Sequence, residues 1–296
     1  MNFMKTYSKS IILILFAIAT LCACSKEEDL GKSNIDVETP NRQGTDKWIY
    51  DNFVVPLNLE VKYRWDDSEV EIDKKLVPAE ESQVIPFLEV VKKVWIEPYT
   101  DKTVVPDETF LKRLSPKQIV LVGSLNYNSD GTITLGTAEG GRKIVLYEVN
   151  GFSKTNKEQV LRMLHTMQHE FGHILHQNKL YPAEFKKITP AYTKTWNNYD
   201  LETCNKEGFI TQYARSSPDE DFVEMIAAML TMSKTEFDNM VKAIKWADGR
   251  NKIREKEQFV VAYYRDKYGI DIYALQQRIA DAMASLNAPV TPPAGK

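Results

Sequence analysis

The sequence has few cysteines and no excess of basic residues. Three cysteines occur in 296 residues, and two of them, Cys22 and Cys24, lie near the N-terminus. Cys204 is left without an intrachain partner, which excludes a disulfide framework. A small buried hydrophobe is the usual role of such a cysteine, and a nucleophile is the alternative. Lysine and arginine number 38 against 41 acidic residues, so nucleic acid is not expected as a partner.

Long apolar runs are also scarce, and one stands at the N-terminus. Two lysines precede the apolar segment 11–19, which is followed by Leu21-Cys22-Ala23-Cys24. The segment is too short to span a bilayer and is typical of a signal peptide over residues 1–23. The Leu-x-Ala-Cys ending resembles the lipobox of bacterial lipoproteins, which implies cleavage before Cys24 and attachment of lipid to it.

Residues 24–45 contain few large apolar groups and are predicted to form a lipidated flexible tether. The acidic stretch Ser25-Lys26-Glu27-Glu28-Asp29 resembles the signal that sends lipoproteins of Bacteroidota-type bacteria to the cell surface. A plain solvated tether is the alternative. We therefore expect an outer-membrane lipoprotein that is exposed at the cell surface and monomeric.

Beyond the tether, the apolar pattern changes character near residue 150. Order is expected to begin near Trp48, and residues 46–150 are predicted to form the α/β part of a catalytic unit, with a helix at 82–95. Its predicted strands are 57–63, 119–122, 132–135 and 143–149, with a tight turn at 128–131. Residues 151–296 are predicted to be the helical, zinc-binding part, with a frayed tail from Ala288. Its predicted helices are 156–178, 218–231, 234–246, 251–267 and 271–286.

The chemistry is concentrated in His169-Glu170-Phe171-Gly172-His173. Residues four apart lie on one face of a helix, so the two imidazoles can bind one zinc ion together. Zinc lowers the pKa of a bound water towards about 7, and Glu170 can take its proton as general base. Thr155 and Glu158 form a capping-box pattern at the predicted helix start. All four histidines of the chain fall between His165 and His176, which favours a metal site.

A catalytic zinc site usually has three protein ligands and an open position, so one ligand is missing. His176 lies about a turn too far along the helix and is expected to support the site from behind, with direct ligation as the alternative. Glu220 belongs to a predicted helix that starts with Ser217 as N-cap and Pro218 in the first turn. From the residues alone, Glu220 can either bind zinc or close a capping box with Ser217. Asp221 is the next candidate.

The spacing of these residues carries a resemblance to the C-terminal peptidase domain of anthrax lethal factor. The similarity lies in HEFGH followed by a Tyr, a Glu seven residues later and another Glu four further on. It implies that Glu220 binds zinc, that Glu224 supports a ligand histidine, and that Tyr213 faces the substrate oxyanion.

A second resemblance covers nearly the whole mature chain. The string HEFGHILHQ, the stretches 123–128 and 135–141, and the Tyr-Ala and Glu-Asp-Phe-x-Glu block resemble substrate-import-associated zinc metallohydrolase lipoproteins. This family accompanies TonB-dependent outer-membrane importers and their binding lipoproteins. The resemblance implies a zincin-like α+β fold, in which a small mixed sheet from the N-terminal half lies above the metal helix.

Three further segments have weaker patterns. The glycine-rich stretch 136–141 lacks the strand and helix order of a dinucleotide site and is predicted to be a loop beside an edge strand. The strand 143–148 can be either a core strand or the strand that pairs with an extended substrate. Tyr192 and Trp196 can wall the cleft or pack in the core.

Two functions are compatible with these patterns. The first is a peptidase with one zinc per chain, with Glu170 as base and Tyr213 as electrophilic helper, acting on peptide or protein substrates. The second is a non-catalytic, zinc-containing capture or assembly lipoprotein of a TonB-dependent import system. An intact Glu170 favours the first function, because a structural zinc has no use for a base beside it.

Overall fold

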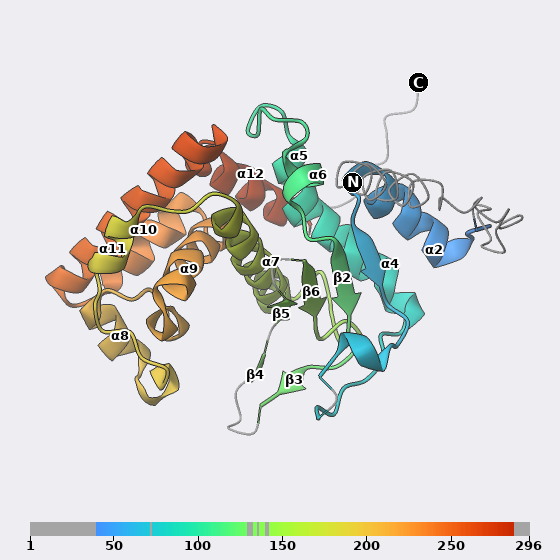
Figure 1. Ribbon diagram of the computed structural model, residues 1–296, viewed down its shortest axis with the longest axis horizontal. Helices are drawn as coiled ribbons and strands as arrows, with labels where there is room; N and C mark the ends of the chain where they lie inside the picture. The colour runs from blue at the N-terminus through green and yellow to red at the C-terminus, as the bar shows by residue number, and fades with distance from the viewer. Residues whose placement is uncertain (1–39, 72, 129–132, 135, 140–141, 287–296) are drawn as a thin grey trace, which may run out of the picture. The chain divides into compact units, whose positions relative to one another are not determined.

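The computed structural model describes residues 40–71, 73–128, 133–134, 136–139 and 142–286 (Figure 1). The predicted signal peptide, Cys24, the acidic stretch, most of the turn at 128–131, Gly140, Gly141 and the tail from Ala288 lie outside them. Residues Gln43–Lys296 form one compact unit. Among the helices of the described part, none has the length and apolar character needed to cross a membrane.

The main sheet has four strands in the order β1-β2-β6-β5. Strands β1 (Glu60–Lys62), β2 (Gln118–Leu121) and β6 (Lys143–Leu146) are parallel, and β5 (Gly136–Glu139) pairs with β6 in the antiparallel sense. The Ile and Val side chains of β2 and β6 are buried, as expected for central strands. A separate antiparallel pair joins β3 (Asn126–Tyr127) and β4 (Ile133–Thr134).

One prediction about this sheet is wrong, and the two alternatives for another segment are now distinguished. Residues 136–139 form a strand instead of a loop, and this strand, β5, is the one at the edge. Of the two alternatives for 143–148, the core strand is the one observed: β6 lies between β2 and β5, so its backbone is already paired on both sides.

The N-terminal half contributes helices that cover the sheet. Helix α2 (Gly44–Ile49) begins before Trp48 and continues through a π-helical turn (Tyr50–Val54) into α3 (Val55–Leu57). As a result, the predicted strand at 57–63 is shortened to β1. Helix α4 (Glu81–Val91) continues similarly through Lys92–Ile96 into α5 (Glu97–Thr100), and α6 (Phe110–Leu114) follows.

The C-terminal half is helical, as predicted. It contains α7 (Lys157–Asn178), α8 (Leu201–Glu207), α9 (Pro218–Thr231), α10 (Lys234–Ala243), α11 (Ala247–Tyr263) with a π-helical turn at Tyr264–Tyr268, and α12 (Ile272–Ser285). Short 3-10 turns lie at Asp67–Glu69, Ala183–Lys187, Trp196–Asn198 and Tyr213–Ser216. The expected α+β fold, a small mixed sheet packed on a mainly helical half, is confirmed.

Helix α7 lies between the sheet and α9 (Figure 1). One side of it is anchored in the core by Phe171, whose ring packs edge-on against Trp95 at 5.4 Å and Tyr99 at 5.1 Å between ring centroids. The Tyr99 hydroxyl also donates to Gln168 Oε1 at 2.8 Å in the buried interior. Because Phe171 faces this cluster, the neighbouring histidines at positions 169 and 173 are turned towards α9.

Candidate metal centre

The helix that carries the histidines is capped one residue later than the sequence predicts. Asn156 is the N-cap, and its side-chain oxygen accepts from the backbone N–H groups of Glu158 and Gln159. Thr155 instead contacts the Ser153 hydroxyl, so the predicted Thr155–Glu158 capping box does not form. Asparagine is among the strongest N-cap residues and outcompetes the threonine before it.

The helices α7 and α9 approach closely where a glycine faces a valine. A Cβ atom added to Gly172 would stand 3.0 Å from Val223 Cγ1. The glycine of the HEFGH string therefore lets the first turns of α9 come against the histidine face of α7. Two carboxylates of α9, Glu220 and Glu224, reach the histidines through this contact.

Two imidazole nitrogens and one carboxylate oxygen converge at the centre of the site. Glu220 Oε2 lies 3.1 Å from His169 Nε2 and 3.2 Å from His173 Nε2. Ligands held by zinc at about 2.0–2.1 Å in a tetrahedron are about 3.3 Å apart, so these separations fit a metal position between the three atoms.

The position of the Glu220 side chain shows whether it closes a capping box with Ser217. Ser217 is the N-cap of α9, and its hydroxyl accepts from the backbone N–H of Glu220 at 3.2 Å. The carboxylate of Glu220 extends instead to His169 and His173. The Ser217 half of the capping box is therefore present, but the Glu220 carboxylate that would complete the box contacts the histidines instead.

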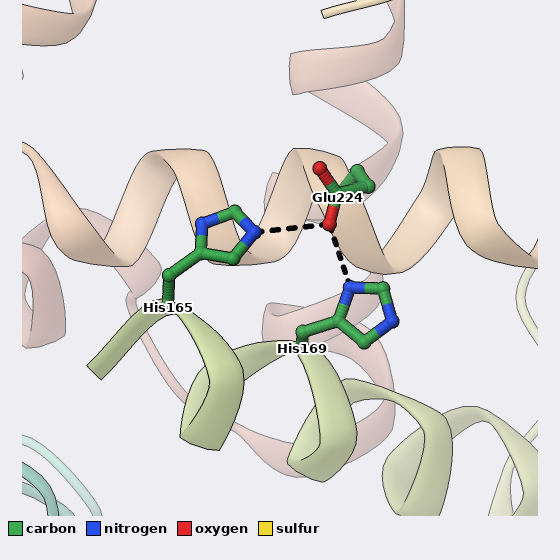
Figure 2. A group of neighbouring side chains, drawn as sticks. All are labelled: His165, His169 and Glu224. Atoms are coloured by element: carbon green, nitrogen blue, oxygen red, sulfur yellow. Dashed lines mark hydrogen bonds and ion pairs between the residues drawn. The ribbon is translucent and has the colours of Figure 1, made fainter. Parts of the chain in front are cut away.

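Glu224 supports the site from behind and lies between two histidine rings (Figure 2). Its Oε1 is 2.7 Å from His169 Nδ1 and 3.0 Å from His165 Nε2. Its Oε2 accepts from the Thr211 hydroxyl at 2.6 Å. Three donors thus fix the orientation of one carboxylate, which in turn fixes the His169 ring.

Both ring nitrogens of His169 face carboxylates, which a neutral imidazole cannot satisfy. Its Nδ1 faces Glu224 and its Nε2 faces Glu220. Neutral imidazole has one N–H and one lone pair, whereas ionised carboxylates only accept. The conflict is resolved by a second proton on the ring, by a proton on one of the carboxylates, or by a metal ion at Nε2. Nδ1 is engaged by Glu224, so Nε2 is the nitrogen that would face a metal ion.

The same conflict appears in the acid–base behaviour of the metal-free chain. Burial lowers the pKa of His169, but the hydrogen bonds to Glu220 and Glu224 outweigh it and raise this pKa to about 10. Burial opposes ionisation of Glu220, yet its hydrogen bonds to the two histidines lower its pKa to about 2. Without metal, the cluster therefore holds a proton where zinc would place its positive charge.

Glu170 lies beside this position without being tied to it. A ligand atom of its carboxylate is within 4.8 Å of ligand atoms of His169 and His173. Burial raises its pKa, against the lowering influence of the two histidines. A buried carboxylate with a raised pKa next to a metal position has the properties of a general base.

His176 and Tyr213 lie on opposite sides of the site. His176 Nε2 is 3.0 Å from His173 Nδ1, so it contacts a histidine of the centre and lies on the side away from Glu220. The Tyr213 ring lies 5.8 Å from the His169 ring between centroids and is 38% exposed. Trp196 packs edge-on against Tyr213 at 5.1 Å and thus supports it at the rim of the site.

Asp221, the next candidate ligand in the sequence, is directed away from the histidines. Its carboxylate is fully buried against Lys256, at 2.6 Å, and accepts from the hydroxyl of Tyr192 at 2.8 Å. Tyr192 therefore braces α9, while Trp196 is the aromatic residue that packs beside the site. Cys204 is buried, in agreement with its expected core role, and burial raises the pKa of its thiol.

Two residues of the site were not predicted from the sequence. His165 could have been found, because it lies one turn before His169 and so continues the same helix face. Thr211 gives no such signal, since it lies in an irregular segment and contacts Glu224 only through the fold.

A helix with two histidines one turn apart, a glutamate between them and a carboxylate from a second helix is the arrangement of zinc-dependent peptidases. A family model described as "Putative zinc-binding metallo-peptidase" matches residues 38–273, and the chain belongs to this family. It is similar to a crystal structure titled as a putative zinc-binding metallo-peptidase from Bacteroides caccae ATCC 43185, with 35% identity and a TM-score of 0.70. The match covers 82% of this chain and 92% of that one. No curated protein matches the chain.

Proposed function

We propose that the protein is an active zinc peptidase with one metal ion per chain, held by His169, His173 and Glu220. The observation that carries the proposal is the conflict at His169, where both ring nitrogens face carboxylates and a metal ion at Nε2 would resolve the conflict. Three protein ligands leave a position open, which distinguishes a catalytic site from a closed structural one. When bound, zinc supplies Lewis-acid polarisation of the scissile carbonyl and of the attacking water.

The residues around the proposed zinc position have distinct roles in the reaction. Glu170 is the general base that takes a proton from the attacking water and then delivers it to the leaving amine. Tyr213 donates a hydrogen bond from its hydroxyl to the developing oxyanion, and burial raises the pKa of this phenol, so it stays protonated and able to donate. Glu224 and His176 orient His169 and His173, respectively. The roles given to Tyr213 and Glu224 are those implied by the similarity to the lethal factor peptidase domain.

The zinc ligands are tested by elemental analysis of single alanine variants at His169, His173 and Glu220. Each is expected to lose bound zinc after dialysis against a weak chelator. Glu158→Ala serves as the control, since Glu158 is exposed at the start of the same helix as the histidines. Full zinc retention by Glu220→Ala would move the third ligand elsewhere.

Catalysis is tested by incubating the zinc-loaded protein with a diverse peptide mixture and mapping the cuts by mass spectrometry. Glu170→Gln is expected to keep zinc and to reduce hydrolysis by about two to four orders of magnitude. Glu158→Gln, an exposed position on the same helix, is the matched control and should cut like the wild type. Zinc-loaded protein that cuts nothing would favour the capture or assembly role.

We also propose that the protein is a monomeric lipoprotein of the outer membrane, anchored through Cys24 and displayed at the cell surface. The support is the lipobox-like ending at Cys24 and the acidic stretch 25–29. The similarity to import-associated lipoproteins suggests a TonB-dependent importer and its binding lipoprotein as partners. A Cys24→Ser protein should become soluble, and protease treatment of intact cells should remove the wild type. Protection of the wild type in intact cells would contradict surface display.

A further inference from the structure

The contact of histidines with a glutamate at the proposed zinc position is repeated one helical turn away. At that position, Glu220 Oε2 faces the Nε2 atoms of His169 and His173. One turn further along α9 and one turn back along α7, Glu224 Oε1 lies 3.0 Å from His165 Nε2 and 2.7 Å from His169 Nδ1. The two glutamates are four residues apart, as are the histidines of each pair, so the same helix faces meet twice.

The side chains of this second contact offer the donors of a metal site (Figure 2). His165, His169 and Glu224 each provide one ligand atom, and these atoms lie within 4.8 Å of one another. Imidazole nitrogen and carboxylate oxygen are ligands that zinc binds at about 2.0–2.2 Å. The separations of 2.7 and 3.0 Å belong to hydrogen bonds. An ion in place of the protons needs these atoms to move only slightly apart, to about 3.3 Å.

His165 gives an ion access to this cluster. Its side chain is 29% exposed, whereas that of Glu224 is 4% exposed. His165 and Thr211 line a cavity of about 590 Å³, and the other described residues of its wall are uncharged. A cavity of about 900 Å³ is also lined by His165 but contains Lys154 and Lys157, whose positive charges repel a cation. The smaller cavity is therefore the better route for an ion and for the water that completes its coordination.

The two metal positions share the His169 ring, so their occupancies are linked. An ion at Nε2 replaces the proton there, and an ion at Nδ1 displaces the remaining ring proton to solvent. The ring is then an imidazolate that bridges two ions about 6 Å apart. His165 binds through Nε2 as a neutral imidazole with its proton on Nδ1. Loss of the last proton of His169 and repulsion between the ions make the second site the weaker one.

We propose that the protein has a second, weaker site for a divalent transition-metal ion such as Zn²⁺, held by His165 Nε2, Glu224 and His169 Nδ1. The ion at His169 Nε2 binds first, and the second site fills only at higher metal concentration. Filling it takes Glu224 from its hydrogen bond to His169, so the level of free metal alters the support of the first site. The inference goes beyond the proposed peptidase and does not depend on peptide cleavage.

The test is a titration of the metal-free full chain with Co²⁺, whose visible absorption reports its coordination. Equilibrium dialysis with elemental analysis counts bound Co²⁺ and Zn²⁺. Wild type should bind two ions, the second on the order of 100-fold more weakly or less tightly still, because the ions repel each other across one ring. His165→Gln should abolish the second step and leave the first nearly unchanged, since the amide N–H can still donate to Glu224.

His173→Ala is the converse variant. It loses a ligand of the first position but keeps His165, His169 and Glu224. In excess metal it should retain one weakly bound ion, which dialysis against a chelator removes. The double variant His165→Gln/His173→Ala should bind none over the same range. Glu158→Gln, exposed at the start of α7, is the control and should show both steps.

The outcomes separate the second site from the proposed zinc position. A wild type with a single ion that His165→Gln keeps, or a second ion that His165→Gln keeps, would overturn the inference. One ion in His173→Ala that the double variant loses would support it. A single ion lost in His165→Gln but kept in both His173→Ala and Glu220→Ala would support the second site and contradict the ligand set of the proposed peptidase.

Discussion

The buried pair of Lys256 and Asp221 allows a quantitative prediction for the variant Lys256→Met. Both side chains are fully buried, with Lys256 Nζ at 2.6 Å from Asp221 Oδ2 and at 2.8 Å from the carbonyl oxygen of Gly208. Asp221 also accepts from Tyr192 and Thr189, but its Oδ1 has no hydrogen-bond partner among the described residues. Removing the lysine leaves a buried carboxylate without its countercharge.

The expected loss of stability is about 3–5 kcal/mol, the cost of breaking a buried ion pair by removing one partner. For a unit of this size, about 2–4 °C of melting temperature corresponds to 1 kcal/mol, so the melting temperature should fall by roughly 6–20 °C. Burial already raises the pKa of Asp221 while Lys256 lowers it, so the variant raises this pKa further. A folded-state pKa above the unfolded value costs stability as pH rises, so the deficit should be smallest at acidic pH and grow towards neutral pH.

Chemical denaturation of the metal-free wild type and variant at several pH values measures this difference. The double variant Asp221→Asn/Lys256→Met should recover most of the stability, because no charge is left buried. Lys245→Met is the matched control: its ion pair with Glu202 is exposed and should contribute at most about 1 kcal/mol. A Lys256→Met protein as stable as wild type at neutral pH, or a deficit that does not change with pH, would refute the reasoning.

Three other predictions concern the metal centre. Thr211→Val should weaken zinc affinity by about 10-fold, whereas Thr211→Ser, which keeps the hydroxyl, should bind zinc like the wild type. Competition with a chromogenic chelator measures both affinities. Equal affinities of the valine and serine variants would contradict the role of the hydroxyl. Gly172→Ala should also weaken zinc binding, because the added methyl group pushes Val223 and α9 away. The net change in folding stability should be small, because replacing glycine stabilises the helix by about 1 kcal/mol and offsets the clash. The double variant Gly172→Ala/Val223→Ala should recover the zinc affinity. The pKa of His169, about 10, predicts release of about one proton per zinc at pH 7. Calorimetry in buffers of different ionisation enthalpy should show this release. The raised pKa also stabilises the metal-free fold below about pH 6.5, and this contribution is lost as pH rises through 10. The stabilisation of the fold by zinc should therefore grow over that pH range.

The elements that the sequence predicts well are those determined by local patterns. The spacing of His169 and His173 fixes a shared helix face, and Ser217 with Pro218 marks the start of α9 at the residue where the structure has it. The sequence pattern places the cap of α7 one residue too early because Thr155 and Asn156 are both suitable caps, and the difference between them is small compared with the contacts that position the helix.

The order of strands could not be predicted in the same way. Residues 136–139 contain Gly, Thr, Ala and Glu, a composition with little strand character, and they become a strand because β6 offers an unpaired side to them. Whether 143–146 is an edge or an internal strand depends on that pairing and leaves no mark in its own apolar pattern. The sequence therefore leaves open whether 143–148 is a core strand or a strand that pairs with substrate, and the pairing with β5 decides for the core strand.

The choice between Glu220 and Asp221 shows why a ligand set can be hard to read from neighbouring residues. Consecutive residues of a helix point about 100° apart, so only one of the two can face α7, but the sequence does not say which. In the folded protein, the positive charges around α9 determine which carboxylate faces α7. Lys256 of α11 is buried on one side of α9 and neutralises Asp221 there, while protonated His169, or a metal ion in place of its proton, neutralises Glu220 on the other side. Glu224 follows Glu220 by one turn and so returns to the histidine face. Asp221 and Glu220 thus have separate countercharges, and the position of the lysine, far away in the sequence, determines which of the two remains for the metal centre.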